Sequence, residues 1–302
     1  MSTRESRLPT AGASPADRRR GLLYGLLGVA CFSLTLPATR IAVTGLDPVF
    51  VGLGRAVVAA LLAAVALLAT RSPWPGRALL PRIAIVAGGV IVGFPLFTAL
   101  AMRHVPASHG AIVIGVLPLA TALAGAWLAH ERPAPAFWLC SVAGSAVVVT
   151  FALWRGGGTL QLADLLLLAA VAAAAIGYAE GGRLARTLGG WQVISWALVL
   201  AAPLVLLPTL WVVDARIVSA APAAWAGFAY VSVVSMFLGF FAWYRGLALG
   251  GIAVVGQTQL LQPFLTLFAS ALLLGEPLDP ATFVAAGLVV VAIGLARRFA
   301  VR

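Results

Sequence analysis

The sequence predicts an all-α integral membrane protein with ten transmembrane helices, arranged as two inverted five-helix repeats. Apolar side chains make up 62% of the 302 residues and charged ones only 10%, with a mean hydropathy of +1.05. A soluble domain averages about 45–50% apolar and about 25% charged residues, so a soluble enzyme, a nucleic-acid-binding protein and a disordered chain are excluded. Two further observations support this fold: most charged residues lie between apolar stretches long enough to cross a membrane, and the two halves of the chain share a sequence motif.

Charge-free stretches mark most of the expected helices. They cover 21–39, 83–102, 104–130, 133–154, 187–213, 217–244, 246–275 and 280–296. Two further stretches, 48–70 and 165–182, each contain a single charge, Arg55 and Glu180. Crossing about 30 Å of hydrocarbon takes about 20 helical residues, and unpaired backbone groups exclude other open-chain structures in lipid. We therefore expect helical spans at about 22–43, 48–70, 82–102, 107–130, 135–154, 161–183, 189–212, 223–245, 252–275 and 280–297.

The distribution of Arg predicts the orientation. With ten spans, both termini lie on one side of the membrane. Fifteen of the 20 basic residues, all of them Arg, fall on that side, and four fall on the other, namely Arg40, Arg103, Arg155 and Arg216. Cytoplasmic loops carry the excess of basic residues, so both termini are predicted to be cytoplasmic. The use of Arg without Lys, with abundant Ala and Gly, is typical of GC-rich bacterial genes, so we expect the inner membrane of a bacterial cell.

The two halves share a motif at an offset of 145 residues. Residues 118–131 and 263–276 have six identities, among them Pro118/Pro263 and Glu131/Glu276. Because five spans is an odd number, the second half is inserted upside down relative to the first, as in many secondary transporters. The expected organisation is a disordered cytoplasmic tail at 1–20, a first repeat at 21–155, a second repeat at 160–298 and a short cytoplasmic tail at 299–302.

Charged groups inside apolar spans are costly and mark candidate functional sites. Arg55 lies about 10 Å into the second span by helix rise. Either it binds a substrate carboxylate or phosphate, or it satisfies helix-end carbonyls and reaches the interface. Glu180, with Tyr178 close by, is the only acid well inside a span. Either it carries a proton or holds a substrate ammonium, or it pairs with Arg183 three residues later.

A second candidate group is a patch of three glutamines in the ninth span: Gln257, Gln259 and Gln262. Gln259 and Gln262 share a helix face, and Pro263 frees a backbone carbonyl beside them. This uncharged face suits a small polar or zwitterionic ligand. The alternative is interhelical hydrogen bonding, worth about 0.6 kcal/mol per contact in membranes. Trp243 and Tyr244 either line the same cavity or belong to an interfacial aromatic belt.

The remaining polar residues are expected to be structural. Asp164 begins the sixth span, where it suits the helix dipole, and Glu131 and Glu276 are expected to cap a following helix or bridge to a loop Arg. His104, His109 and His130 are expected at interfaces or in loops. The patterns Gly21/Gly25, Gly89/Gly93 and Gly177/Gly181 allow helices to approach closely.

Several segments resemble the EamA-type members of the drug/metabolite transporter superfamily. These are FSLTLPATR (32–40), Gly54-Arg55-Ala56, GYAEGGRLAR (177–186), the long segment 239–267 and Gly275-Glu276. The resemblance covers about residues 21–298. It implies ten helices, paired five-helix repeats and metabolite export. Two positions depart from the family pattern: Phe32 stands where members usually have Trp, and Arg40 stands where they usually have Lys.

We therefore expect a secondary transporter that exports a small metabolite such as an amino acid, or a drug-like amphiphile, by alternating access around a midplane cavity. The sequence has no Walker A motif, so direct use of ATP is excluded. One alternative is an intramembrane enzyme, for which the sequence offers no catalytic set and no HExxH-type metal site. The other is a membrane sensor or scaffold without flux. The expected partners are a small-molecule substrate and the lipid bilayer, with a homodimer as one option, and no cofactor, metal or nucleic acid.

Overall fold

The computed structural model describes residues 15–128, scattered positions between 135 and 154, and residues 161–213, 216–250, 252–277 and 280–300. All regular secondary structure in these residues is helical. Seven helices in this described part are long and apolar enough to cross a membrane, and two shorter apolar helices run over Gln262–Leu274 and Pro280–Ala292. The expected span at 135–154 lies mostly outside the described residues, so the number of ten spans stays a prediction.

In the first half, each described span consists of two or more helical segments in series. The segments are α1 (Pro15–Ser33) and α2 (Thr35–Val43); η1 (Phe50–Gly54) and α3 (Arg55–Ala69); η2 (Arg77–Leu79), α4 (Leu80–Val86), η3 (Ala87–Gly93) and α5 (Phe94–Ala101); and α6 (Ala107–Ile114) and α7 (Leu117–Leu128). The segments η1 and η3 are π-helical turns.

The second half has three unbroken long helices and two interrupted spans in its described residues. The segments are α9 (Leu162–Leu188); α10 (Gly190–Trp211); the short α11 (Arg216–Ser219); α12 (Pro222–Ala229), the π-helical η4 (Tyr230–Leu238) and α13 (Gly239–Gly250); α14 (Ile252–Val255), the 3₁₀-helical η5 (Gly256–Leu261) and α15 (Gln262–Leu274); and α16 (Pro280–Ala300). The span expected over 252–275 is helical through residue 274, with the 3₁₀ segment η5 interrupting the α-helix. Pro263 has no N–H with which to continue the hydrogen-bond ladder across the break.

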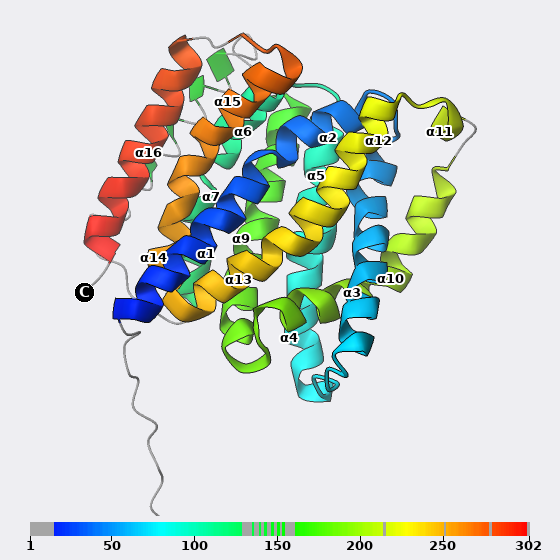
Figure 1. Cartoon of the computed structure of the whole chain (residues 1–302). Coiled ribbons are helices and arrows are strands. Elements are labelled where there is room, and N and C mark those ends of the chain that lie inside the picture. The colour runs from blue at the N-terminus through cyan, green and yellow to red at the C-terminus, as the bar shows by residue number, and fades with distance from the viewer. Residues whose placement is uncertain are drawn as a thin grey trace, which may run out of the picture.

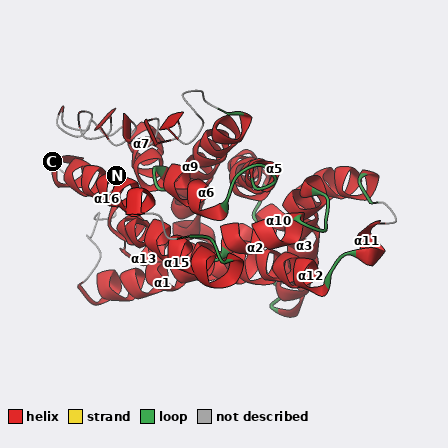
Figure 2. Cartoon of the chain, turned by 90° about the horizontal axis from the view of Figure 1, so that it is seen from above, coloured by secondary structure: helices red, strands yellow, loops and turns green. Residues whose placement is uncertain are grey.

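The two halves interlock rather than stand apart (Figures 1 and 2). The first span of one half packs on the third span of the other: α1 lies along α13, and α9 lies against α4, η3 and α5. The two second spans contact each other through α3 and α10, and the two fourth spans through α6 and α15. Exchanging the halves leaves this set of contacts unchanged, as a two-fold relation between them requires.

Glycines allow the closest of these crossings. A Cβ on Gly89 of η3 would lie 2.4 Å from the carbonyl oxygen of Ala173 on α9, and one on Gly21 of α1 would lie 2.6 Å from the backbone nitrogen of Gly250 on α13. Backbones that approach this closely gain dispersion contacts that larger residues would prevent. The glycine patterns in the sequence are therefore used within the chain, at contacts between its two halves.

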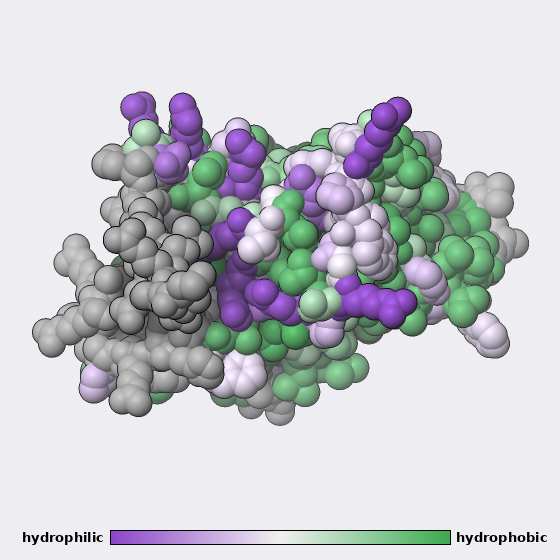
Figure 3. All heavy atoms as spheres, turned by 90° about the horizontal axis from the view of Figure 1, so that it is seen from below, coloured by the Kyte–Doolittle hydropathy of each residue, from purple (hydrophilic) through white to green (hydrophobic). Residues whose placement is uncertain are grey.

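The outer surface is that of a membrane protein. Large apolar side chains on the sides are exposed, for example Leu61, Leu68, Leu204, Leu207 and Trp211. Such side chains suit contact with lipid, because hydrocarbon removes the cost of exposing them to water. Hydrophilic side chains gather on the lower face (Figure 3), the end at which α1 begins, α16 ends and the connections from α3 to α4 and from α9 to α10 lie (Figure 1).

Candidate functional site

Two interrupted helices, one from each half, pack against each other. The break between α6 and α7 falls at Gly115 and Val116, and the break before α15 falls in η5. Pro118 and Pro263, which share a position in the repeated motif, each stand at the second residue of the helix that follows the break. Both prolines line one narrow cavity of about 10 Å³, room for about one water molecule, together with Leu36, Ala111, Ile114, Gly115, Leu117, Gln259, Gln262 and Thr266.

A neighbouring cavity continues this space toward Arg55. It has a volume of about 20 Å³, so in this state of the protein it is also closed to anything much larger than water. Its walls come from both halves and comprise Phe32, Thr35, Leu36, Arg55, Val90, Phe94, Ile114, Tyr178, Ser235, Phe240 and Gln262. Since Leu36, Ile114 and Gln262 line both cavities, we treat the two as one site and name it the central cavity.

Arg55 is the charged group of the central cavity. It begins α3 directly after the π-helical turn η1, and the residue is only 2% exposed. Its Nε has no hydrogen-bond partner, and no ion pair or hydrogen bond joins its guanidinium to another residue of the described part. The alternative in which Arg55 satisfies helix-end carbonyls therefore has no contact to support it there. A buried, unpaired guanidinium is costly, which is a reason to expect an anion at this position in another state of the protein.

The glutamine patch also reaches the central cavity. Gln259 is 1% exposed, and neither oxygen nor nitrogen of its amide has a hydrogen-bond partner in the described part of the chain. Gln262 lines both parts of the cavity. The side chain of Gln257 lies outside the residues that the structure describes. An unpartnered buried amide costs about 1–3 kcal/mol, so Gln259 is poorly explained as a link between helices.

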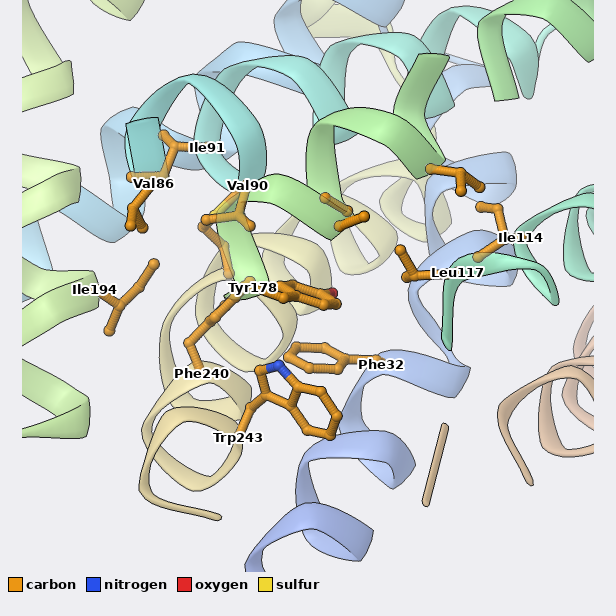
Figure 4. Close-up of a cluster of buried hydrophobic side chains, with 14 of the residues drawn as sticks. Phe32, Val86, Val90, Ile91, Ile114, Leu117, Tyr178, Ile194, Phe240 and Trp243 are labelled. Atoms are coloured by element: carbon orange, nitrogen blue, oxygen red, sulfur yellow. The ribbon is translucent and has the colours of Figure 1, made fainter. Parts of the chain in front are cut away.

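Four aromatic rings, those of Phe32, Tyr178, Phe240 and Trp243, cluster beside the cavity (Figure 4), and the first three line it. Phe32 stacks on Tyr178 with ring centroids 6.4 Å apart, and it meets Phe240 at 5.1 Å and Trp243 edge-on at 6.0 Å. Phe32 therefore takes part in stacking although it replaces the Trp of the family pattern. Trp243 is fully buried behind this layer, so it is not a belt residue, and it does not line either part of the cavity described above. Tyr244 is also fully buried and donates its hydroxyl to the Gly177 carbonyl at 3.2 Å.

Glu180 lies outside the walls of the central cavity. Its Oε1 pairs with Arg82, at the start of α4, and its Oε2 accepts a hydrogen bond of 3.2 Å from Arg183. The carboxylate side chain is 3% exposed, whereas the two arginines are 35% and 39% exposed. The i,i+3 pair expected from the sequence is thus present, with a second arginine from the other half that local spacing could not indicate.

Other polar residues of this site were not found by sequence reasoning. Thr35 and Ser235 line the cavity and share a hydrogen bond of 2.8 Å across the two halves. Ser235 lies in η4, and Val90, another wall residue, lies in η3. Both are π-helical turns at matching places in the third span of each half, and such turns are frequent at functional sites. A single hydroxyl in a Val/Phe-rich run gives no signal that it faces a cavity.

The opposite, upper end of the molecule has a separate polar cluster. His109 lies buried on α6 rather than in a loop, and its Nε2 lies 2.6 Å from Oδ1 of Asp164. The other oxygen of Asp164 accepts the backbone N–H of Gln161 as part of a capping box at the start of α9, where the sequence analysis predicted only a favourable interaction with the helix dipole. Glu276 caps α6 of the first half, not the helix that follows it, by accepting the N–H groups of Ala107 and Ser108 at 2.9 Å each. Glu131 lies outside the described residues.

Among the described residues, no group of three or more His, Cys, Asp or Glu side chains lies close enough together to hold a metal ion.

Comparison with known proteins identifies related sequences and a related fold. The model of the EamA-like transporter family matches the chain twice, at residues 19–153 and 161–298. The chain is 48% identical over 281 residues to the "Uncharacterized transporter YdeK" of Bacillus subtilis, covering 93% of this chain and 98% of that protein. It is 27% identical over 278 residues to a "Probable terminal-alkyne amino-acid exporter" of Streptantibioticus cattleyicolor, covering 90% and 92%. A crystal structure of another protein, 20% identical, shares the fold with a TM-score of 0.65 over 94% of this chain and 98% of that one.

Proposed function

We propose that this chain, which belongs to the EamA-like transporter family and is a multi-pass membrane transporter of that family, is an exporter. It exports small metabolites such as amino acids, or drug-like amphiphiles, by alternating access. The substrate binds in the central cavity, between two inverted five-helix repeats. The two repeats rock about this cavity and open it to one side of the membrane at a time.

The observation that carries the proposal is the meeting of two interrupted helices around buried, unpartnered polar groups. Discontinuous helices at the interface between repeats are typical of transporter binding sites, because freed backbone groups and helix ends can serve the substrate there. The breaks before Leu117 and Gln262 come from opposite halves, and both face the central cavity. An apolar site with a few convergent polar groups is also the general form of a small-molecule site.

The proposed roles follow from the positions of the side chains. Arg55 binds an anionic group of the substrate, and Gln259 and Gln262 bind its neutral polar groups. Tyr178 forms an aromatic wall of the cavity, and Trp243 supports that wall from behind. Gln257 is retained as a candidate from its place in the glutamine patch. The name of the Streptantibioticus relative supports an amino acid as one class of substrate.

Two roles remain in competition for Glu180. Its ion pairs with Arg82 and Arg183 favour a structural link between α4 and α9 at the lower end of the molecule. Proton coupling would require this carboxylate to leave both arginines during the cycle. The first role needs no such step, and we favour it.

The proposed topology has ten spans, with both termini cytoplasmic in a bacterial inner membrane. The arrangement of the described helices supports it, since α1 begins and α16 ends at the same hydrophilic end (Figures 1 and 3). The excess of Arg on the side of the termini gives the same orientation.

A two-stage experiment tests the proposed function. Metabolites in the medium are first compared between cells with and without the gene. The compounds that are more abundant in the medium of cells with the gene are then tested for flux with the full-length protein in proteoliposomes. We expect at least one small metabolite to be depleted from the medium of cells lacking the gene and to cross proteoliposomes faster than protein-free ones. Purified, monodisperse protein that moves none of the compounds would contradict transport and favour a sensor or scaffold.

A further inference from the structure

The charge balance of the central cavity limits the chemistry of its ligand. Arg55 contributes one positive charge, and none of the carboxylates in the described part of the chain lines either part of the cavity. Glu180 pairs with two arginines, Asp164 pairs with His109, and Glu276 caps α6. When empty, this cavity has a net positive charge that no carboxylate among its described wall residues neutralises.

An ammonium group would meet no carboxylate among the described walls of this cavity. The remaining polar groups in its walls are amides and hydroxyls, and the Thr35 and Ser235 hydroxyls are already bonded to each other. A bound ammonium would also be repelled by the guanidinium of Arg55 in a low-dielectric environment. The cavity therefore gains more from binding a carboxylate than from binding an amine.

A carboxylate fits better than a phosphate. One guanidinium and one carboxylate form a bidentate, neutral pair. A phosphate monoester close to its second ionisation would leave uncompensated negative charge against the rings of Phe32, Phe240 and Tyr178 and the aliphatic walls, and buried charge without a partner is strongly unfavourable.

From these observations, and resting on the proposed transport function, we propose that the central cavity, in the state that admits substrate, selects carboxylates bearing an apolar group over the corresponding amines and phosphates, and that the α-amino group of an amino acid is dispensable for binding. Arg55 is the residue that determines this selectivity. A carboxylate without the amino group then binds at least as tightly as the amino acid with the same carbon skeleton.

Four compounds of one skeleton test the proposal: leucine, 4-methylpentanoate, 3-methylbutylamine and 3-methylbutyl phosphate. Binding is measured by calorimetry with the full-length protein in nanodiscs, because weak acids and amines cross bilayers unaided and would confuse a flux assay. We expect 4-methylpentanoate to bind at least as tightly as leucine. The amine and the phosphate are expected to bind at least tenfold more weakly.

Variants at Arg55 test whether this residue determines the preference for carboxylates over amines. Arg55→Gln should weaken binding of 4-methylpentanoate about 10–100-fold, as the loss of a charge-assisted pair predicts. Arg55→Lys, which keeps the charge without the bidentate geometry, should weaken binding less and keep the preference for the acid over the amine. Arg103→Gln removes the same charge at an exposed position and should change neither affinity nor preference.

Three results would overturn the proposal: leucine binding more than tenfold tighter than 4-methylpentanoate, the amine binding as tightly as the acid, or unchanged binding in folded Arg55→Gln protein. Failure of all four compounds to bind would overturn it as well. None of these results bears on flux of other metabolites, so the proposed transport function is judged separately by the proteoliposome experiment.

Discussion

Replacing Gln259 by Met distinguishes a ligand-binding glutamine from one that links helices. Both amide atoms of Gln259 are buried without a partner among the described residues, and Met is unbranched and of similar size. If the amide forms its hydrogen bonds only with a bound ligand, Gln259→Met removes the free-energy cost of a buried amide without hydrogen bonds in the empty protein. Stability should then rise while transport falls, a trade-off expected of functional residues.

The size of the effect follows from the cost of unmet hydrogen bonds. An unsatisfied buried polar group costs about 1–3 kcal/mol, and part of this is recovered in the unfolded reference state within the membrane. We expect Gln259→Met to stabilise the empty protein by about 1 kcal/mol. For a chain of this size, that corresponds to a rise in melting temperature of about 2–4 °C. A hydrogen-bonded link between helices would instead cost about 0.6 kcal/mol when removed.

The assay is thermal unfolding in nanodiscs, with flux measured on the same preparations. Thr266→Val is the matched control, because the Thr266 hydroxyl donates to the Ser33 carbonyl at 2.8 Å and so makes the kind of interhelical bond that Gln259 lacks. Thr266→Val should lower the melting temperature. If Gln259→Met lowers it as well, or leaves flux at the wild-type rate, Gln259 is not held ready for a ligand and the reasoning fails.

Three further predictions concern contacts between the halves. Gly89→Ala should lower stability by about 1–3 kcal/mol, because its Cβ would lie 2.4 Å from a carbonyl oxygen on α9. The control Gly88→Ala should be close to neutral, because a Cβ there meets nothing within 4 Å. Equal melting temperatures of the two variants would contradict the close crossing of η3 and α9. Glu180→Gln should lower stability by about 1–2 kcal/mol. This is near the lower end for hydrogen bonds between charged groups, because both arginine partners are about a third exposed. The variant should retain pH-driven flux. Loss of that flux with unchanged stability would identify Glu180 as a proton carrier instead. Glu276→Gln weakens the cap on the first turn of α6 and should cost about 1 kcal/mol in thermal unfolding; a neutral result would show that this cap contributes nothing to joining the halves.

The fold class and part of the site follow from local sequence. Apolar stretches of span length are enough to predict membrane helices, because lipid allows few other structures. Arg55, Gln259 and Gln262 were predicted as cavity residues because a charged or amide side chain inside an apolar span is conspicuous, and the structure brings all three to the central cavity. The break beside Pro263 was signalled by the proline but not its 3₁₀ geometry.

Contacts between segments far apart in the chain could not be predicted from the sequence. The pairing of Arg82 with Glu180, and of His109 with Asp164, depends on which helices become neighbours, and apolar spans give no register for that. The burial of Trp243 was missed for the same reason: a Trp near a span end has the same local sequence whether it faces lipid or the other half of the chain. The hydroxyl of Ser235 is conspicuous only once η4 is known to turn it toward the cavity.

Accessibility of the cavity wall from both sides of the membrane tests the alternating-access account most directly. Ile114 lines both parts of the central cavity, and Ile114→Cys in a Cys31→Ser, Cys140→Ser background provides a single reactive thiol. A small membrane-impermeant thiol reagent is applied to right-side-out and to inside-out vesicles, with and without a transported compound. We expect labelling in both orientations and slower labelling with substrate; labelling from one side alone, whether or not substrate is present, would contradict a cavity that opens to each side in turn.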